Sequence, residues 1–383
     1  MFHFEAASEI LVCAGASVST FMLSWTKSRV HEPLTIVPKQ EDDDLLNMQL
    51  QFGYNEHSFV GISVQPEVWN DRKNNGAVSY NESGKVWIVA GEPLGREEDL
   101  PAITAEFVKY ARSRKKIVAF LPTTEKYARS VASQNLRIVK VGASPYFDLQ
   151  NWNPRGNSAK KLRLGVNRGR RSGVAVEEIR NVTAEFRREV DDLTTQWNDC
   201  RRAGVNFGWL FELIPFQNSK SKKYFAARTG DGKLVGLLAA SPIPAREGWY
   251  LEDVLRSSDA PDGTSDLLVF ETLKFLAAQG AKLATLGTVP LSQKGANDLS
   301  TGNNFIVEKA LAFSRNHLNS LYNFDGLGCF KSKFVPTWWE SEYVIVSKGF
   351  LIPPRVANAV FNVIIPGGLL QIIRLLFAAE RPA

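Results

Sequence analysis

The sequence predicts an α/β protein in which one sheet-and-helix unit occurs twice. Strand-like and helix-like patterns alternate along the first half of the chain and again along the second half. The 383 residues are enough for two domains of ordinary size. The composition, 44% apolar and 22% charged, is that of a globular protein with a substantial core. We therefore expect two modules, each a mixed central sheet flanked by helices.

The first half contains apolar runs of strand length separated by helical patterns. Runs at 85–90 and 117–121 predict strands, and apolar residues at helical spacing predict a helix over 100–114. Residues 68–83 are polar and rich in Asn and Gly, so we expect a surface loop there. The remaining expected elements are a helix over 124–135, with Thr123 or Thr124 as its cap, and strands over 136–141 and 146–149.

The second half predicts a hairpin followed by a strand, a helix and a further strand. Gly230-Asp231-Gly232 is a turn signal between apolar runs at 224–227 and 234–241. A strand is expected over 248–255, a helix over 265–278 and a strand over 283–286. This order is the core of the acetyltransferase-like (GNAT) fold. Its occurrence in both halves predicts a duplicated module.

The predicted organisation has five parts. These are an N-terminal apolar and linker segment (1–45), a first module (46–150), a basic linker helix (151–175), a second module (176–348) and a C-terminal apolar or amphipathic segment (349–383). The apolar run at 10–25 is shorter than the roughly 20 residues that span a bilayer, which favours a buried or interfacial helix over an anchor. The run at 356–377 is broken at Pro366-Gly367-Gly368 and either lies in a membrane interface or packs on the protein itself.

The positive charge of the chain is concentrated in the linker. No acidic residue occurs between Asp148 and Glu177, while seven Lys and Arg residues do, and the net charge of the whole chain is +6. The patch suits a phosphate-rich partner, either nucleic acid or an anionic lipid surface. Its alternative is a solvated helix face. The candidate phosphate-binding residues are Lys160, Lys161, Arg163, Asn167, Arg168 and Arg171.

Three glycines weaken the prediction of a helix in this linker. Lys160, Arg163, Asn167 and Arg171 share one face at helical spacing. Gly165, Gly169 and Gly173 lower helix propensity, although glycine also lets a backbone approach a ligand closely.

The turn that would bind the pyrophosphate of coenzyme A is poorly suited to it. Acetyltransferases of this fold hold the pyrophosphate on a glycine-rich turn after the fourth strand. The matching segment here, Ser258–Ser265, has one glycine and two acids, Asp259 and Asp262. Carboxylates would repel a pyrophosphate. We therefore expect an acyl donor other than coenzyme A.

The Cys and His residues give no metal-binding pattern. Three cysteines form no CxxC pair, and four histidines form no HxxxH or HExxH pattern. We expect no metal, and the absence of a disulfide framework favours a reducing compartment.

Three stretches of the sequence carry a family resemblance. The first is FDL at 147–149 with GNSAKKLR at 156–163 and Asn167-Arg168; the second is LEDVLR at 251–256 with DAPDGTSD at 259–266; the third is LYNFDGL at 321–327 with Phe330-Lys331 and Lys333-Phe334. In order and spacing they resemble the C-terminal catalytic domain of the phosphatidylglycerol lysyltransferase family, including its shorter relatives of uncharacterised function.

The resemblance implies a function and its partners. Members of the family have two acetyltransferase-like modules, take an aminoacyl group from aminoacyl-tRNA and esterify a lipid head-group hydroxyl. No cofactor is implied beyond aminoacyl-tRNA as co-substrate. The partners would be aminoacyl-tRNA and an anionic phospholipid or membrane surface, with the protein in the cytoplasm and peripherally attached to the cytoplasmic face of the membrane. Larger members carry a flippase domain ahead of the catalytic part; this sequence has none, and we expect modification of a lipid without flipping.

Five residues of the second module are candidates for the chemistry. Asp253 and Asp266 could pair with the α-amine of the substrate or assist deprotonation of the acceptor. Arg256 could contact the tRNA end. Lys331 and Lys333, expected in a strand or turn, could reach the developing oxyanion or a lipid phosphate. The structural alternatives are an Asp253–Arg256 ion pair, a helix cap at Asp266 and a solvated edge at the two lysines.

Three other functions remain open from the sequence. One is aminoacyl transfer to a peptide or peptidoglycan precursor. Another is coenzyme-A-dependent acetylation, which the acidic turn disfavours. The third is a non-catalytic protein that binds tRNA or an anionic membrane. The sequence does not indicate the amino acid transferred, the acceptor or the oligomeric state, and the segment 204–216 (GVNFGWLFELIPF) gives no reason to expect lysine specificity.

Overall fold

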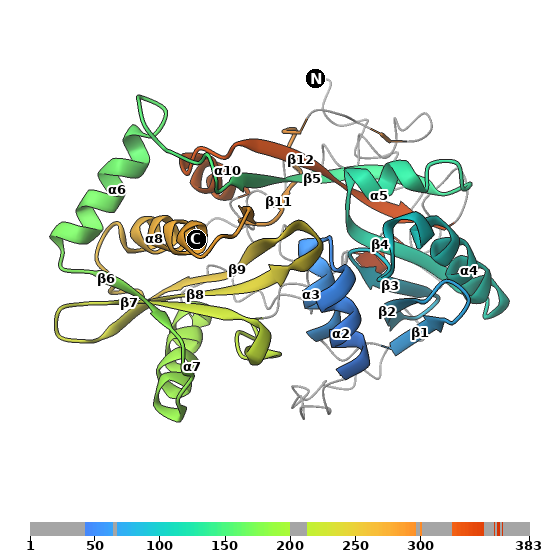
Figure 1. Ribbon diagram of the computed structural model, residues 1–383, viewed down its shortest axis with the longest axis horizontal. Helices are drawn as coiled ribbons and strands as arrows, with labels where there is room; N and C mark the ends of the chain where they lie inside the picture. Colours follow the sequence, from blue (N-terminus) through green and yellow to red (C-terminus); the bar gives the residue numbers. More distant parts are fainter. Residues whose placement is uncertain are drawn as a thin grey trace, which may run out of the picture. The chain divides into compact units, whose positions relative to one another are not determined.

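The computed structural model describes residues 43–63, 67–199, 213–295, 299–300 and 324–347, with 356, 358–360 and 362 beyond them (Figure 1). The apolar run at 10–25 and most of the C-terminal segment 349–383 lie outside the described residues. So do Asn323 and the preceding part of the third motif. Within the described chain, none of the helices combines the length and the apolar character needed to cross a bilayer.

The described strands form one mixed sheet of twelve strands. In chain order they are β1 (Glu67–Asp71), β2 (Gly76–Ser83), β3 (Val86–Ala90), β4 (Ile117–Thr124), β5 (Arg137–Asp148), β6 (Ala175–Ile179), β7 (Lys223–Arg228), β8 (Leu234–Ile243), β9 (Gly248–Arg256), β10 (Leu283–Thr285), β11 (Val289–Pro290) and β12 (Trp338–Val346). In space the order is β1-β2-β3-β4-β12-β5-β10-β9-β8-β7-β6, and β11 pairs with β5.

Helices cover this sheet. The α-helices are α2 (Asp43–Phe52), α3 (Glu56–Ser63), α4 (Leu100–Ser113), α5 (Glu125–Ser130), α6 (Lys160–Arg171), α7 (Ala184–Asp199), α8 (Thr264–Ala278) and α10 (Phe324–Lys333); the 3-10 helices are η1 (Glu97–Asp99), η3 (Ser219–Ser221) and η4 (Pro244–Arg246). Apolar side chains of α4 and α8 form the centre of two separate cores, one on each half of the sheet. The basic linker is helical, as expected.

The same order of elements occurs in both halves and confirms the duplicated α/β fold. In the first half, β2 and β3 are antiparallel, and α4 connects β3 to the parallel strand β4. In the second half, β8 and β9 are antiparallel, and α8 connects β9 to the parallel strand β10. The parallel pairing of β9 with β10 covers only Gly248–Tyr250 on β9. The rest of β9, up to Arg256, pairs with β8 and not with β10.

Strand β12 joins the two halves. Its residues fall by sequence within the second module, yet it lies between β4 and β5 of the first. It pairs antiparallel with β5 from Trp338↔Tyr146 to Val346↔Arg137, and with β4 from Glu342↔Thr124 to Val346↔Ala119. The far end of β5 in turn pairs with β10 of the second half. The backbone hydrogen bonds of both modules therefore belong to a single sheet.

Two predicted elements were wrong in type. Residues 68–83, expected as a loop, contain β1 and β2, because Trp69, Val78 and Tyr80 pack into the core. The turn between the strands is held by the Asp71 side chain, which accepts hydrogen bonds from the backbone of Lys73 and Asn74. Lys331 and Lys333, expected in a strand or turn, lie in α10. The strands expected over 136–141 and 146–149 are one strand, β5. The predicted cap is confirmed, because the Thr124 side chain accepts a hydrogen bond from the Tyr127 amide.

Glycines bring α6 against the start of α8. Gly263 has a φ of +90°, and a Cβ there would lie 2.2 Å from the carbonyl oxygen of Gly165. A Cβ on Gly169 would lie 2.9 Å from the carbonyl oxygen of Gly263. The glycines of α6 thus permit close packing of two backbones within the protein. The basic helix is held directly on the turn that precedes α8.

Because of this contact, we expect one methyl group added at Gly263 to lower the stability of the protein strongly. Gly263→Ala would combine a strained positive φ with a backbone clash, and we expect it to lower the free energy of unfolding by about 2–4 kcal/mol in urea titrations. Gly84→Ala is the matched control, since Gly84 has a φ of +60° but no atom within 4 Å of the added Cβ. Equal losses in the two variants would show that the α6–α8 contact contributes nothing.

Candidate functional site

The described chain buries many charged side chains where β9, β12, α3 and α10 meet. These side chains, called here the buried charged cluster, are Glu56, His57, Lys222, Glu252, Asp253, Lys331 and Glu342. Acidic and basic side chains are almost never fully buried unless they are paired or functional. The cluster draws from both halves of the molecule. It is therefore the candidate site.

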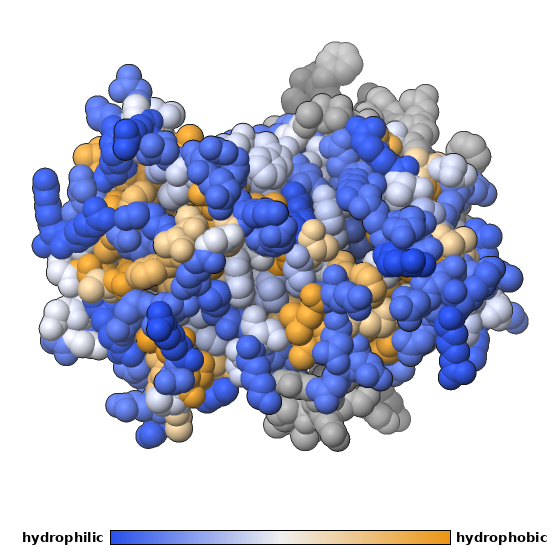
Figure 2. Space-filling view, viewed as in Figure 1, coloured by the Kyte–Doolittle hydropathy of each residue, from blue (hydrophilic) through white to orange (hydrophobic). Residues whose placement is uncertain are grey.

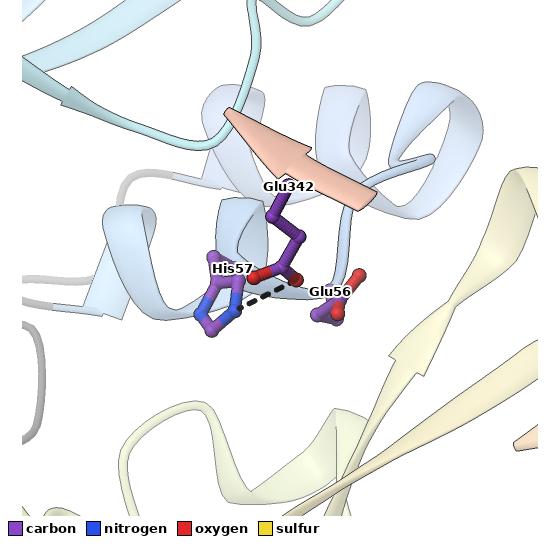
Figure 3. A group of neighbouring side chains, drawn as sticks. All are labelled: Glu56, His57 and Glu342. Atoms are coloured by element: carbon purple, nitrogen blue, oxygen red, sulfur yellow. Dashed lines mark ion pairs between the residues drawn. The ribbon is translucent and has the colours of Figure 1, made fainter. Parts of the chain in front are cut away.

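Two carboxylates and one imidazole form the first part of the cluster. Glu56 and His57 begin α3, and Glu342 extends toward them from β12 (Figure 3). The Nε2 atom of His57 lies 4.0 Å from Oε1 of Glu342 and 2.8 Å from the Thr288 hydroxyl. Burial and the neighbouring Glu56 carboxylate raise the pKa of Glu342 well above its usual range. Burial lowers the pKa of His57, which favours a neutral imidazole.

A β-bulge in β9 forms the second part. Ala239 of β8 pairs with Asp253 and Ala240 pairs with Leu251, so Glu252 is an extra residue in β9. A bulge redirects the side chains around it, and here two consecutive carboxylates enter the interior. Lys222 Nζ lies 3.0 Å from Oε2 of Glu252, with 0% and 8% of the two side chains exposed.

Asp253 is the less compensated of these two carboxylates. Its Oδ2 atom is buried without a hydrogen-bond partner in the described part of the chain. Burial and the adjacent Glu252 carboxylate raise the pKa of Asp253 to about 7, while the Lys222 ammonium opposes the shift. An acid with such a pKa can both accept and donate a proton near neutral pH.

Lys331 forms the third part. Its Nζ atom donates hydrogen bonds to the carbonyl oxygens of Gly287 and Thr288, at 2.9 and 2.8 Å. Burial lowers the pKa of Lys331 to about 7, and the Glu342 and Glu56 carboxylates only partly oppose this shift. Lys331 is thus a second group that can exchange a proton near neutral pH. Its ammonium group points to the loop that carries Thr288, whose hydroxyl contacts His57.

Aromatic side chains form one wall of the cluster. The Tyr146 hydroxyl donates to Oε2 of Glu56 at 2.6 Å. The Tyr146 ring is stacked on Trp338 (centroids 5.4 Å apart, planes at 7°), and the Arg246 guanidinium lies 4.2 Å from its centroid. Arg246 also pairs with Glu340 at 3.1 Å. This wall fixes the position of the Glu56 carboxylate.

Of the five predicted catalytic residues, Asp253 and Lys331 are buried, and each lies beside other charged groups of the cluster. Asp266 and Lys333 form an ion pair with each other, between the first turn of α8 and the end of α10. The Asp266 carboxylate also lies against Gly165 of α6, and it does not cap α8, whose N-cap is Gly263. Arg256 is exposed at the end of β9.

The cations of α6 are exposed at the edge of the molecule. Leu162, Val166 and Gly169 are buried, and the candidate residues Lys160, Lys161, Arg163, Asn167, Arg168 and Arg171 are exposed. Figure 2 shows hydrophilic side chains gathered over this helix at the upper left. Three arginines have partners within the protein: Arg168 pairs with Asp262, Arg170 with Glu271, and Arg163 donates to the Gly156 carbonyl. In the described ranges, Lys160, Lys161 and Arg171 have no ion pair.

Sequence reasoning missed most of the cluster. Glu56, His57, Lys222, Glu252 and Glu342 were not among the candidates. Glu252 stands next to Asp253 and needed only the bulge to be recognised. Glu342 had a weak signal, because it belongs to a short polar stretch, Glu340–Glu342, within the strand Trp338–Val346. Glu56 and His57 lie almost 300 residues away from Glu342 in the sequence, and no spacing rule connects them.

The sequence matches a known family model. The family is described as "Phosphatidylglycerol lysyltransferase, C-terminal", and the match covers residues 53–346. Curated relatives named phosphatidylglycerol lysyltransferase include one from Bacillus subtilis (strain 168), 23% identical over 84% of this chain and 37% of the relative. Another, from Staphylococcus aureus (strain COL), is 22% identical over 85% of this chain and 38% of the relative. The chain thus spans little more than a third of the length of these relatives.

Solved structures share the fold. The structure described as L-PGS from Bacillus licheniformis aligns with a TM-score of 0.68 and 20% identity, covering 90% of this chain and 99% of that one. A C-terminal domain of a putative lysylphosphatidylglycerol synthetase from Agrobacterium fabrum aligns with a TM-score of 0.66 and 22% identity, over 85% and 98%. FemX aligns at 0.50 with 8% identity, over 80% and 96%. At these identities the likeness concerns the fold alone.

The raised pKa of Asp253 predicts how stability depends on pH. The folded state holds its proton up to about pH 7, whereas the unfolded state releases it near 3.8, so the folded state binds more protons between these values. We expect the free energy of unfolding of the wild type to fall relative to Asp253→Asn as pH rises from about 4 to about 7, by on the order of a few kcal/mol. Urea titrations at several pH values measure this.

Asp262→Asn serves as the control for this series, because it removes one carboxylate from an exposed position. Parallel stability curves for the wild type and Asp253→Asn across the whole pH range would contradict the assignment of a buried, protonated Asp253.

Proposed function

Because the chain belongs to the phosphatidylglycerol lysyltransferase C-terminal family, we propose that it moves an aminoacyl group from an aminoacyl-tRNA to the hydroxyl of a membrane lipid such as phosphatidylglycerol. The observation that carries the proposal is the buried charged cluster, in which Asp253 and Lys331 both have a pKa of about 7. Two groups poised to exchange protons in a dry interior suit acyl transfer between oxygens.

The exposed cations of α6 support a nucleic-acid donor. Lys160, Lys161 and Arg171 are free of intramolecular ion pairs in the described chain, so tRNA phosphates can pair with them without breaking existing contacts. Arg256 is exposed at the end of β9, the strand that carries Asp253, and we assign it the contact with the acceptor end of the tRNA.

The packing at the start of α8 supports a donor other than coenzyme A. A pyrophosphate bound to this turn would need the amides that precede α8. There the backbone of Gly263 packs directly against Gly165 and Gly169 of α6. The same turn carries Asp259 and Asp262, which pair with Lys233 and Arg168. We propose that aminoacyl-tRNA is the co-substrate and that the transfer needs no further cofactor.

The reaction exchanges one ester for another. The bond between the aminoacyl carbonyl carbon and the terminal ribose oxygen of the tRNA breaks, and a bond from that carbon to the lipid oxygen forms. The proton of the lipid hydroxyl passes to a base, for which Asp253 in its ionised form is suited, and a proton is returned to the leaving ribose oxygen. The ammonium form of Lys331 stabilises the oxyanion of the tetrahedral intermediate. Glu252 and Asp253 attract the α-ammonium group of the substrate.

The Asp266–Lys333 ion pair is assigned a supporting role. It connects α8 to α10 and lies against α6 at Gly165, so it holds the basic helix in place relative to Lys331. In this proposal the protein works in the cytoplasm, peripherally attached to the cytoplasmic face of the membrane, where anionic lipid and charged tRNA meet.

A peptide or peptidoglycan precursor is the second candidate acceptor. It is favoured only by the fold shared with FemX. A binding-only role for tRNA or an anionic membrane is the third candidate.

An in-vitro transfer assay tests the proposal. The purified full chain is incubated with radiolabelled aminoacyl-tRNAs and total polar lipids, and label in the organic phase is counted with and without ribonuclease pretreatment. We expect ribonuclease-sensitive label in the lipid, and leaving out one tRNA at a time identifies the amino acid. No label in lipid, under conditions where a known family member transfers, would reject the lipid acceptor; a parallel reaction with peptidoglycan precursors would test the second candidate.

Variants separate catalysis from binding. Asp253→Asn and Lys331→Met remove the proposed proton-exchanging groups, and we expect each to lower kcat by about 10²–10⁴-fold with little change in tRNA affinity. Unchanged transfer rates in both variants would reject the cluster as the catalytic site.

The cations of α6 predict a salt-dependent change in tRNA affinity. Replacing Lys160, Lys161 and Arg171 together by Gln should weaken tRNA binding and reduce the slope of log affinity against log salt by up to about 3, or about 1 per cation. Filter binding at several salt concentrations measures both. The matched control replaces Lys109, Arg114 and Lys115, three exposed cations at the end of α4 and just after it, by Gln. An equal change in the control would show that only net charge matters.

A further inference from the structure

Glu56, His57 and Glu342 converge on one point in the interior. One ligand atom from each residue can be chosen so that all three lie within 4.8 Å of one another, and all three residues are buried. Ligand atoms that share a zinc ion, each about 2 Å from it, lie about 3–4 Å apart. Figure 3 shows the two carboxylates and the ring facing one another. Small side-chain movements would therefore complete a coordination sphere.

We propose that this trio binds one divalent transition-metal ion, with zinc as the best match. An imidazole together with two carboxylates suits zinc more than calcium or magnesium, which prefer oxygen ligands alone. The proposal does not depend on the transferase function. It differs from the expectation of no metal, which rested on the spacing of Cys and His along the sequence.

Hydrogen bonds orient each carboxylate and leave one oxygen free. The Ser144 hydroxyl donates to Oε1 of Glu342 at 2.5 Å, and the Tyr146 hydroxyl donates to Oε2 of Glu56 at 2.6 Å. The other two oxygens, Oε2 of Glu342 and Oε1 of Glu56, are buried without a hydrogen bond. Hydrogen bonds of this kind from neighbouring groups are what position the ligands of metal sites.

The buried carboxylates also lack a neutralising cation. In the part of the chain that the structure describes, no Lys or Arg nitrogen lies within 4.0 Å of the carboxylate oxygens of Glu56 or Glu342. The nearby Lys331 ammonium is bound instead to two backbone carbonyls. Two carboxylates buried side by side require compensation, and one divalent cation supplies it in full. The competing arrangement is a proton shared between the two carboxyl groups.

The His57 imidazole favours a bound transition-metal ion over a proton shared between the two carboxyl groups. Nε2 is the ring nitrogen on the side of the carboxylates, 4.0 Å from Oε1 of Glu342, and it also lies 2.8 Å from the Thr288 hydroxyl; Nδ1 is buried on the other side of the ring (Figure 3). A neutral imidazole presents one unprotonated nitrogen as a ligand. The ion would connect α3, which packs on β3 and β8, to β12. Its role would be structural.

Metal titration of the full chain tests this inference. Protein stripped with a chelator is titrated with Zn²⁺ by calorimetry and with Co²⁺ by visible absorption. We expect one equivalent to bind and to raise the midpoint of thermal unfolding. The Co²⁺ spectrum should show d–d bands without a thiolate charge-transfer band, which separates this site from binding by cysteines.

Isosteric variants locate the ion. Glu56→Gln and Glu342→Gln keep the shape of the side chains, and each should weaken binding by at least about tenfold. Glu189→Gln is the control, since Glu189 lies on α7 outside the cluster and pairs with Arg228; binding should be unchanged. Circular dichroism verifies folding, and if a glutamine variant does not fold, the wild-type titration still decides.

Two results would overturn the metal site. One is no binding of Zn²⁺ or Co²⁺ by the wild type at micromolar concentration. The other is binding that all three variants retain. Either result, with an unfolding free energy that rises in Glu342→Gln, would identify the trio as a proton-sharing carboxyl pair.

Discussion

The pairing of β12 with β5 is the constraint on which the rest of the structure depends. It merges the sheets of two modules into one, and it carries Glu340 and Glu342 into the space between them. Strand β5 contributes Ser144 and Tyr146 to the same space, and β10 anchors the other end of β5 beside β9. The buried charged cluster exists because these strands are shared. Neither module alone contains it.

The charged side chains of this cluster differ in whether an opposite charge lies in direct contact with them. Lys222 is paired with Glu252, and Arg246 with Glu340, so these charges are compensated by direct contact. Asp253, Lys331 and the Glu56–Glu342 pair are not, and their protonation is displaced from the usual range. Groups with displaced pKa values tend to be functional. The cluster thus divides into charges that hold the site together and groups that are available for chemistry.

Sequence patterns were sufficient to predict the repeated unit, because each of its signals depends on residues that are close together in the sequence. The Gly230–Gly232 turn, the Thr124 cap and the apolar periodicity of α4 each depend on neighbouring residues, and each has its counterpart in the structure. Only part of the site could be predicted from the sequence, because its residues come from segments that lie far apart in the chain. Asp253 and Lys331 came from motifs that resemble a known family, whereas Glu56, His57 and Glu342 meet only through the position of β12. The bulge at Glu252 depends on a backbone pairing that no local pattern encodes.

The position of β12 also dictates the order in which the protein can be completed during synthesis. Strand β4 emerges from the ribosome early, but its neighbour in the sheet is Trp338–Val346, more than 200 residues later. Until then, β4 and β5 each have an unpaired edge, which is a template for wrong pairing with other strands. Contacts of such long sequence separation also slow folding. Closure of the sheet is therefore a late step, and the buried site forms together with it.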